Sequence, residues 1–179
     1  MSMTKELRIA CDIDDCIANF LDPYFAKFGR PKKHDYEITR NVYKLRNNKS
    51  FWENLPVLER MDFEPHIYCT KRINSKIYTR NWIKKNNFPI KPIYQMYNQH
   101  GNKADLIKGR CDILIDDSYS NVSKAIKSGL PALLLTRPHN IHIDTPYRIS
   151  ALNYKEIKLK YESLFGSYSW KYPAYKNGR

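Results

Sequence analysis

Short apolar runs alternate along the chain with segments in which apolar residues recur at helical spacing. The runs have the length of buried strands, and their continuous hydrophobic character is typical of parallel sheets that are covered on both faces. The strand-like runs occupy residues 7–13, 66–70, 90–96, 111–116 and 132–136, and the helical segments occupy 75–86, 103–107 and 118–128. This alternation predicts an α/β fold with a Rossmann-like, doubly wound parallel sheet.

Residues 19–62 interrupt the alternation after the first strand. Phe20, Tyr24 and Phe28 recur at roughly helical spacing there, and the segment contains little strand signal. We therefore predict a small helical cap inserted after the first strand of a core domain. The core would comprise residues 1–18 and 63–160, and residues 161–179 would form a basic, aromatic C-terminal tail.

Two aspartates, Asp12 and Asp14, come at the end of the first apolar run. Open α/β sheets bind their ligands at the carboxyl ends of the strands, so this is a predicted active-site position. Residues two apart in a strand point the same way, so both carboxylates are expected to address one point and attract a hard cation such as Mg2+. Considered alone, the pattern fits a turn capped by aspartate better.

The other strand ends change that balance. Asp116 and Asp117 end the fourth run, Thr70 ends the second and is followed by Lys71, and Lys103 opens the short helix before the fourth. Two acidic strand ends on one rim of a sheet repel each other unless a cation binds between them. Together the strand ends predict a site for a metal ion and a phosphate.

The chain is strongly basic, with 31 Lys and Arg residues against 18 Asp and Glu residues and a formal net charge of +13. Such a charge favours phosphorylated substrates or nucleic acid through long-range attraction. The basic residues are spread along the sequence, and the simpler alternative is that they form solvated faces.

The cysteines and the apolar runs exclude some classes of protein. Cys11, Cys16, Cys69 and Cys111 are scattered singly, without the spacing of a zinc site or a disulfide framework, so we expect reduced core thiols. No apolar run reaches the length of a membrane span, and the polar start has no signal-peptide character. We expect a cytoplasmic protein with no membrane partner.

The order of the strand-end motifs resembles that of the haloacid dehalogenase superfamily of phosphohydrolases. The matching stretches are DIDD at 12–15, Thr70, Lys103 and IDD at 115–117. Within the superfamily the chain is most similar to the 5'(3')-deoxyribonucleotidases, through IYCTKR at 67–72, the pair Phe51–Trp52 before Leu55–Pro56, and HNIH at 139–142. The resemblance covers roughly residues 7–160.

The resemblance implies a Mg2+-dependent 5'-nucleotidase that hydrolyses (deoxy)ribonucleoside monophosphates through an aspartyl-phosphate. Asp12 would be the nucleophile and Asp14 the acid and base. The other implied roles are Mg2+ binding by Asp12, Asp14, Asp116 and Asp117, phosphate binding by Thr70, Lys71 and Lys103, and substrate binding by Phe20, Phe51 and Trp52 of the cap. Phe51 and Trp52 could equally fill the core of the cap.

The chain departs from the family pattern at three places. Cys16 stands where the family usually has Thr or Val, Asp15 replaces a common glycine, and Lys71–Arg72 replaces small residues. Two alternatives stay open: a phosphatase acting on the 3' or 5' phosphate ends of nucleic acid, and a non-catalytic basic component of a nucleoprotein assembly. Two partners for the tail also stay open: nucleic acid and the second subunit of a homodimer.

Overall fold

The computed structural model describes residues 6–31, 34–98 and 100–166. Its centre is a six-stranded sheet in which every neighbouring pair of strands is parallel, in the order β3-β2-β1-β4-β5-β6. The strands are β1 (Ile9–Asp12), β2 (Ile67–Thr70), β3 (Ile93–Gln95), β4 (Ile113–Asp116), β5 (Ala132–Leu135) and β6 (Arg148–Ile149). The predicted α/β fold with a doubly wound parallel sheet is confirmed.

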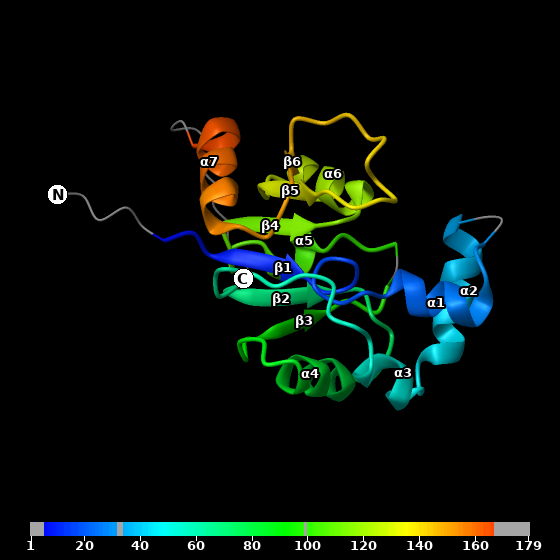
Figure 1. Ribbon diagram of the computed structural model, residues 1–179. Coiled ribbons are helices and arrows are strands. Elements are labelled where there is room, and N and C mark those ends of the chain that lie inside the picture. The colour runs from blue at the N-terminus through cyan, green and yellow to red at the C-terminus, as the bar shows by residue number, and fades with distance from the viewer. Residues whose placement is uncertain (1–5, 32–33, 99, 167–179) are drawn as a thin grey trace, which may run out of the picture.

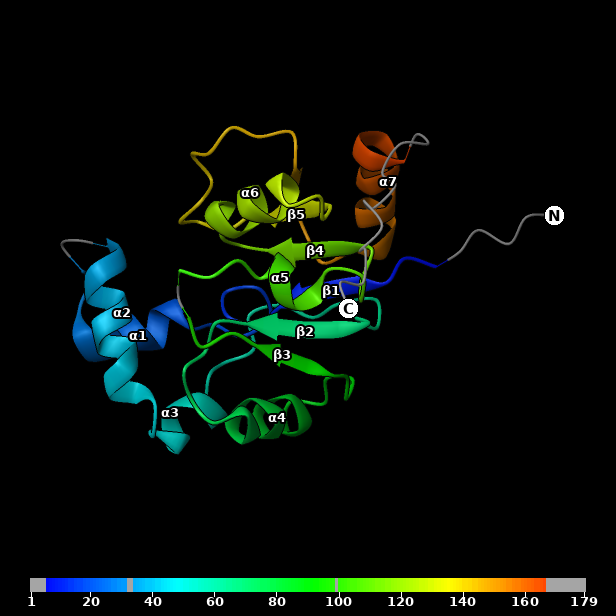
Figure 2. The same ribbon diagram turned by 180° about the vertical axis from the view of Figure 1, so that it is seen from behind.

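Helices cover both faces of the sheet (Figures 1 and 2). On one face, α4 (Lys76–Lys85) and α7 (Tyr154–Phe165) pack against Ile9 and Cys11 of β1. On the other face, α5 (Ala104–Ile107) and α6 (Tyr119–Lys127) pack against Ala10. Side chains alternate between the faces along each strand, so even a four-residue apolar strand serves two cores.

The same alternation places the strand-end carboxylates. Ala10 of β1 and Leu114 of β4 belong to the core beneath α5 and α6. Asp12 and Asp116 lie two residues further along these strands, which directs their side chains toward that same face. Lys103, the residue before α5, is on this face as well. The sheet geometry therefore brings together two carboxylates and a lysine that are far apart in the sequence.

The insertion after β1 is helical, and consists of α1 (Leu21–Phe28), α2 (His34–Leu45) and α3 (Lys49–Glu53). Figure 1 shows β1, β2 and β4 pointing toward α1 and α2, which lie beyond the carboxyl ends of the strands. Aromatic side chains form the interior of the insertion: Phe20 contacts both Tyr24 and Trp52 at ring-centroid distances of 5.5 and 5.8 Å. The cap thus stands over the edge of the sheet where the acidic residues gather.

The C-terminal part of the described chain differs from the prediction. The sequence pattern indicated neither β6 nor α7, because β6 has only two residues and α7 presents mostly polar residues around Ile157 and Phe165. The boundary expected at residue 160 falls inside α7, and the tail from residue 167 lies outside the described residues. Among the described residues, no helix combines the length and the apolar character that a membrane span requires.

Arg137, which follows β5, ties the β1 loop to its surroundings. Its Nε donates to the carbonyl oxygen of Asp15 at 2.7 Å, and its Nη2 donates to that of Cys16 at 2.6 Å. The same Nη2 forms an ion pair with Glu59 at 2.7 Å, and Glu59 in turn accepts a hydrogen bond from the backbone of Leu152. One largely buried guanidinium therefore fixes the loop that contains the first acidic motif.

Replacing Arg137 by Ala should destabilise the fold by about 3 to 5 kcal/mol, because it leaves Glu59 and two carbonyl oxygens without their partner. Urea unfolding followed by circular dichroism measures this change. The matched control is Lys158→Ala, which removes a half-exposed partner of Glu162 at 4.0 Å and should cost less than about 0.5 kcal/mol. Similar losses in both variants would show that Arg137 does not fix the loop.

Candidate functional site

The centre of the candidate site is the ammonium group of Lys103, which lies between two strand-end carboxylates. Its Nζ is 2.7 Å from Asp12 Oδ1 and 2.7 Å from Asp116 Oδ2. All three side chains are buried, with Lys103 only 2% exposed. Charges in such surroundings are costly unless they are paired, so the three groups stabilise one another.

Burial and charge act in opposite directions on these groups. Burial raises the pKa of Asp12 well above its usual value, and Asp116 and Asp117 add to the rise while Lys103 opposes it. Burial by itself would lower the pKa of Lys103, but Asp116 and Asp12 raise it well above its usual value. The lysine is therefore held as an ammonium ion. The negative charge of the carboxylates around it favours the binding of a further cation.

Asp14 faces a different cation. The sequence pattern placed Asp12 and Asp14 on one strand and pointing the same way, but β1 ends at Asp12 and the chain turns away. The carboxylate of Asp14 accepts hydrogen bonds from Arg72 Nη2 at 2.6 Å and Nε at 2.9 Å, and from Thr70 Oγ1 at 3.3 Å. The two aspartates therefore have different partners, which suits different chemical roles.

Arg72 connects this carboxylate to the cap. Its side chain is 2% exposed, its Nη1 donates to Thr79 Oγ1 at 3.2 Å, and its guanidinium carbon lies 5.1 Å from the ring centroid of Trp52. A guanidinium over an indole ring is a favourable cation–π arrangement. The position of Asp14 is therefore linked to the aromatic interior of the cap.

Lys71 lies on the wall of the site next to α6. Its Nζ donates to Asn121 Oδ1 at 2.8 Å, and Asn121 Nδ2 donates to both carboxylate oxygens of Asp116 at 3.1 and 3.2 Å. Burial, together with the nearby ammonium groups of Lys103 and Lys124, lowers the pKa of Lys71 to about 8. Several cations crowded at one site disfavour one another and favour an anion.

A cavity of about 350 Å³ opens among these groups. One part of its wall is polar, with Asp12, Asp14 and Asp117 facing the cations. Another part is apolar. Its lining residues are Asp12, Asp14, Asp15, Lys71, Arg72, His100, Lys103, Asp117, Ser118, Ser120, Asn121 and Lys124 on the polar side and Phe20, Ile38, Val42 and Trp52 on the apolar side. A ligand with an anionic end and an apolar end fits this division.

Not every expected site residue reaches the cavity. Thr70 and Asp116 are buried and do not line it. Instead, Thr70 contacts the lining residue Asp14, and Asp116 contacts the lining residues Lys103 and Asn121. Phe51 is not a lining residue and lies edge-on to the rings of Phe20 and Trp52. The remaining expected residues, namely Asp12, Asp14, Phe20, Trp52, Lys71, Lys103 and Asp117, line the cavity together.

Trp52 contributes only part of its surface to the cavity. It is 1% exposed, its Nε1 donates to the carbonyl oxygen of Leu45 at 2.8 Å, and its ring stacks on Phe20 with an interplanar angle of 9°. Trp52 therefore fills the core of the cap and also borders the cavity, and its contact with a substrate stays a prediction.

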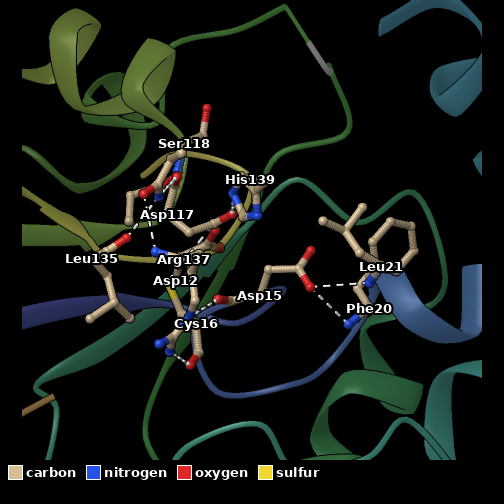
Figure 3. Close-up of polar contacts among 12 residues, drawn as sticks. Asp12, Asp15, Cys16, Phe20, Leu21, Asp117, Ser118, Leu135, Arg137 and His139 are labelled. Atoms are coloured by element: carbon tan, nitrogen blue, oxygen red, sulfur yellow. Dashed lines mark hydrogen bonds and ion pairs between the residues drawn. The ribbon is translucent and has the colours of Figure 1, made fainter. Parts of the chain in front are cut away.

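The loop after β1 has a second group of polar residues, shown in Figure 3. Asp15 has a positive φ of 57°, and its Oδ1 accepts hydrogen bonds from the amides of Phe20 and Leu21 at 3.1 Å each, where α1 begins. Asp117 accepts a hydrogen bond from His139 Nε2 at 2.9 Å. Glycine adopts a positive φ more readily than aspartate does, so the side-chain contacts of Asp15 help to hold this loop.

The donors at this edge of the sheet fit a hard divalent cation. Asp12 and Asp117 offer buried carboxylate oxygens, and Asp12 Oδ1 is paired with the ammonium group of Lys103 at 2.7 Å. Carboxylate oxygens are the ligands that Mg2+ takes in proteins. Asp12 and Asp117 are therefore the carboxylates around which a Mg2+ site would be built, whereas the side chains of Asp14 and Asp116 are paired with Arg72 and Lys103. Mg2+ binding by Asp14 and Asp116 stays a prediction.

Comparison with models of known protein families gives no match, and a search of curated proteins finds no significantly similar sequence. The candidate site therefore has to be interpreted from its own geometry.

Asp15 provides a test of the loop. Asp15→Ala should destabilise the fold by about 1 to 3 kcal/mol, because alanine loses the two amide contacts and adopts positive φ poorly. Asp15→Asn should be nearly neutral at about pH 4, since asparagine tolerates positive φ and caps helices. Unfolding by urea in the presence of a chelator measures both.

The same residue gives a pH dependence. Burial, with Asp117 nearby, raises the pKa of Asp15 to about 8, despite the two amide contacts. The folded state then binds a proton that the unfolded state has released, so this contribution to stability is lost as pH rises from about 4 to about 8. Asp15→Asn should reduce this fall, whereas the exposed control Asp105→Asn should leave it unchanged. Equal slopes in all three chains would contradict the assignment.

Proposed function

We propose that this chain is a Mg2+-dependent phosphomonoesterase of the haloacid dehalogenase type, and that it hydrolyses nucleoside monophosphates. The observation that supports this most strongly is the meeting of Asp12, Lys103 and Asp116 at the carboxyl edge of the sheet, with Lys103 2.7 Å from both carboxylates. These are three of the four motif positions on which the resemblance rests. Thr70, the fourth, hydrogen bonds to Asp14 at 3.3 Å on the same edge.

In the proposed reaction, Asp12 attacks the phosphorus atom. The bond from phosphorus to the ester oxygen breaks as the bond to the carboxylate oxygen forms, so one difficult displacement becomes two easier ones. Lys103 and Lys71 supply positive charge to the phosphate oxygens on which negative charge develops. Mg2+ held at Asp12 and Asp117 would supply further positive charge to the phosphate.

Asp14 moves the protons. It donates a proton to the departing alcohol oxygen, and it then removes a proton from the water that hydrolyses the aspartyl-phosphate. Arg72 and Thr70 hold its carboxyl group, and Asp14 lines the cavity, so it can reach a leaving group there. Asp12 and Asp14 have different partners and would perform different steps.

The cap provides the groups that would distinguish substrates. The catalytic residues engage only the phosphate, so discrimination among phosphate esters must come from the rest of the cavity. Phe20, Ile38, Val42 and Trp52 form its apolar part, and a nucleobase has an apolar face that can lie on such a wall. Phe51 would support these rings from behind.

A substrate panel tests the proposal. The purified chain should hydrolyse nucleoside monophosphates with Mg2+, lose this activity in EDTA and regain it when excess Mg2+ is added. Activity that persists in EDTA would contradict the role of the carboxylates.

Two further outcomes of the panel separate the alternatives. The net charge of +13 favours a longer polyanion, so 3'- and 5'-phosphorylated oligonucleotides are included. Clear preference for oligonucleotides would identify a phosphatase of nucleic-acid ends. No hydrolysis of any ester would favour a non-catalytic basic protein.

The nucleophile is tested by Asp12→Asn. The substitution retains the shape of the side chain but removes its nucleophilic charge, so kcat should fall by about 100-fold or more. The chain should still fold, because Asp116 remains paired with Lys103. The thermal midpoint checks folding, and the exposed Asp144→Asn serves as the control for loss of one charge. A variant with nearly full activity would exclude Asp12 as the nucleophile.

A further inference from the structure

Cys16 lies beside the carboxylates at which the metal is proposed to bind. Three possible ligand atoms, one each from Asp12, Cys16 and Asp117, lie within 4.8 Å of one another, and all three residues are buried. Cys16 Sγ is 3.9 Å from Asp117 Oδ1. Figure 3 shows Asp12, Cys16 and Asp117 gathered in the loop region next to β1, with His139 beyond Asp117.

One of these separations is close to that between two ligands of a four-coordinate transition metal. Zinc binds thiolate sulfur at about 2.3 Å and carboxylate oxygen at about 2.0 to 2.2 Å, so tetrahedral ligands lie about 3.3 to 3.8 Å apart. The sulfur and the oxygen of Asp117 are almost at this separation already. Small side-chain movements would bring a carboxylate oxygen of Asp12 into range, since the three ligand atoms already lie within 4.8 Å of one another.

The surrounding groups also suit such an ion. His139 Nε2 contacts the second oxygen of Asp117 at 2.9 Å, and a neighbour of this kind orients a carboxylate ligand. Mg2+ takes oxygen ligands and gains little from sulfur, whereas Zn2+ and Co2+ bind thiolates readily. The thiol of Cys16 therefore favours binding of Zn2+ or Co2+ over binding of Mg2+.

We propose that Cys16, together with Asp12 and Asp117, forms a site that binds Zn2+ or Co2+ through a sulfur–metal bond and overlaps the proposed Mg2+ site. On binding, the sulfur–hydrogen bond breaks, the proton leaves to water and the sulfur–metal bond forms. The consequence for activity rests on the proposed function: Zn2+ would compete with Mg2+ and inhibit the enzyme.

The test is a titration of the metal-free full chain with Co2+ alone, followed by absorption spectroscopy. Thiolate coordination gives an intense sulfur-to-cobalt charge-transfer band in the near ultraviolet, which oxygen ligands do not give. In the wild-type chain, the intensity of this band should increase until one equivalent of Co2+ has been added. Cys16→Ser and Cys16→Val should lack it, and Cys111→Ser should keep it because that cysteine lies in the core beneath α5 and α6.

Zn2+ binding, measured by competition with a coloured chelator, gives a second readout. Cys16→Val should weaken Zn2+ binding by about 100-fold or more and change Mg2+ binding little. Valine is close to cysteine in size, so the Val variant keeps the packing if the Ser variant does not fold. Absence of the band from the wild-type chain, or its retention in a folded Cys16 variant, would overturn the proposal.

The readouts separate this proposal from the proposed function. A chain that gives the band but hydrolyses no phosphate ester supports the metal site and refutes the phosphatase. A chain that is active with Mg2+ but lacks the band does the opposite.

Discussion

The organisation of the site depends on one buried cation. Lys103 is enclosed at the start of α5, and its ammonium group lies 2.7 Å from carboxylates at the ends of two neighbouring strands. Removing one partner of such a buried arrangement costs about 3 to 5 kcal/mol, because an uncompensated charge is left behind. The requirement to pair these charges therefore fixes α5 against β1 and β4 and holds the acidic strand ends together.

A second ion pair joins the cap to this edge of the sheet. Arg72 holds Asp14 on one side and contacts Trp52 on the other, so the acidic loop and the apolar wall share one buried guanidinium. Arg137 has a comparable role beneath the loop, where it holds two carbonyl oxygens and Glu59. Arg72 thus lines the cavity and Arg137 fixes the loop after β1, and the partners of both arginines come from segments far apart in the sequence.

The sequence was most informative where apolar patterning and strand ends coincide. Continuous apolar runs predicted the sheet, and the parallel topology then required Asp12, Thr70 and Asp116 to share one edge. Short elements were harder, since the two residues of β6 leave no period to detect. The partnership of Arg72 with Asp14 had no local signal either, because it joins residues 58 positions apart.

Other features of the site depend on exact packing. The sequence indicated aromatic residues in the cap, but only the arrangement of the rings shows that Trp52 borders the cavity while Phe51 lies behind it. Similarly, Cys16 was expected to be an ordinary core thiol. Its proximity to Asp117 arises because the β1 loop, fixed by Arg137, passes close to the end of β4.

The proposed reaction requires that Asp12 becomes phosphorylated during turnover. The most direct measurement uses Asp14→Asn, in which the hydrolytic water loses its base, mixed with a nucleoside monophosphate and Mg2+ and quenched rapidly in acid. Mass spectrometry of the digested chain should find one phosphoryl group on the peptide that contains Asp12, and none in Asp12→Asn treated in the same way. Released phosphate with no phosphorylated peptide, or a phosphoryl group on another residue, would contradict the account.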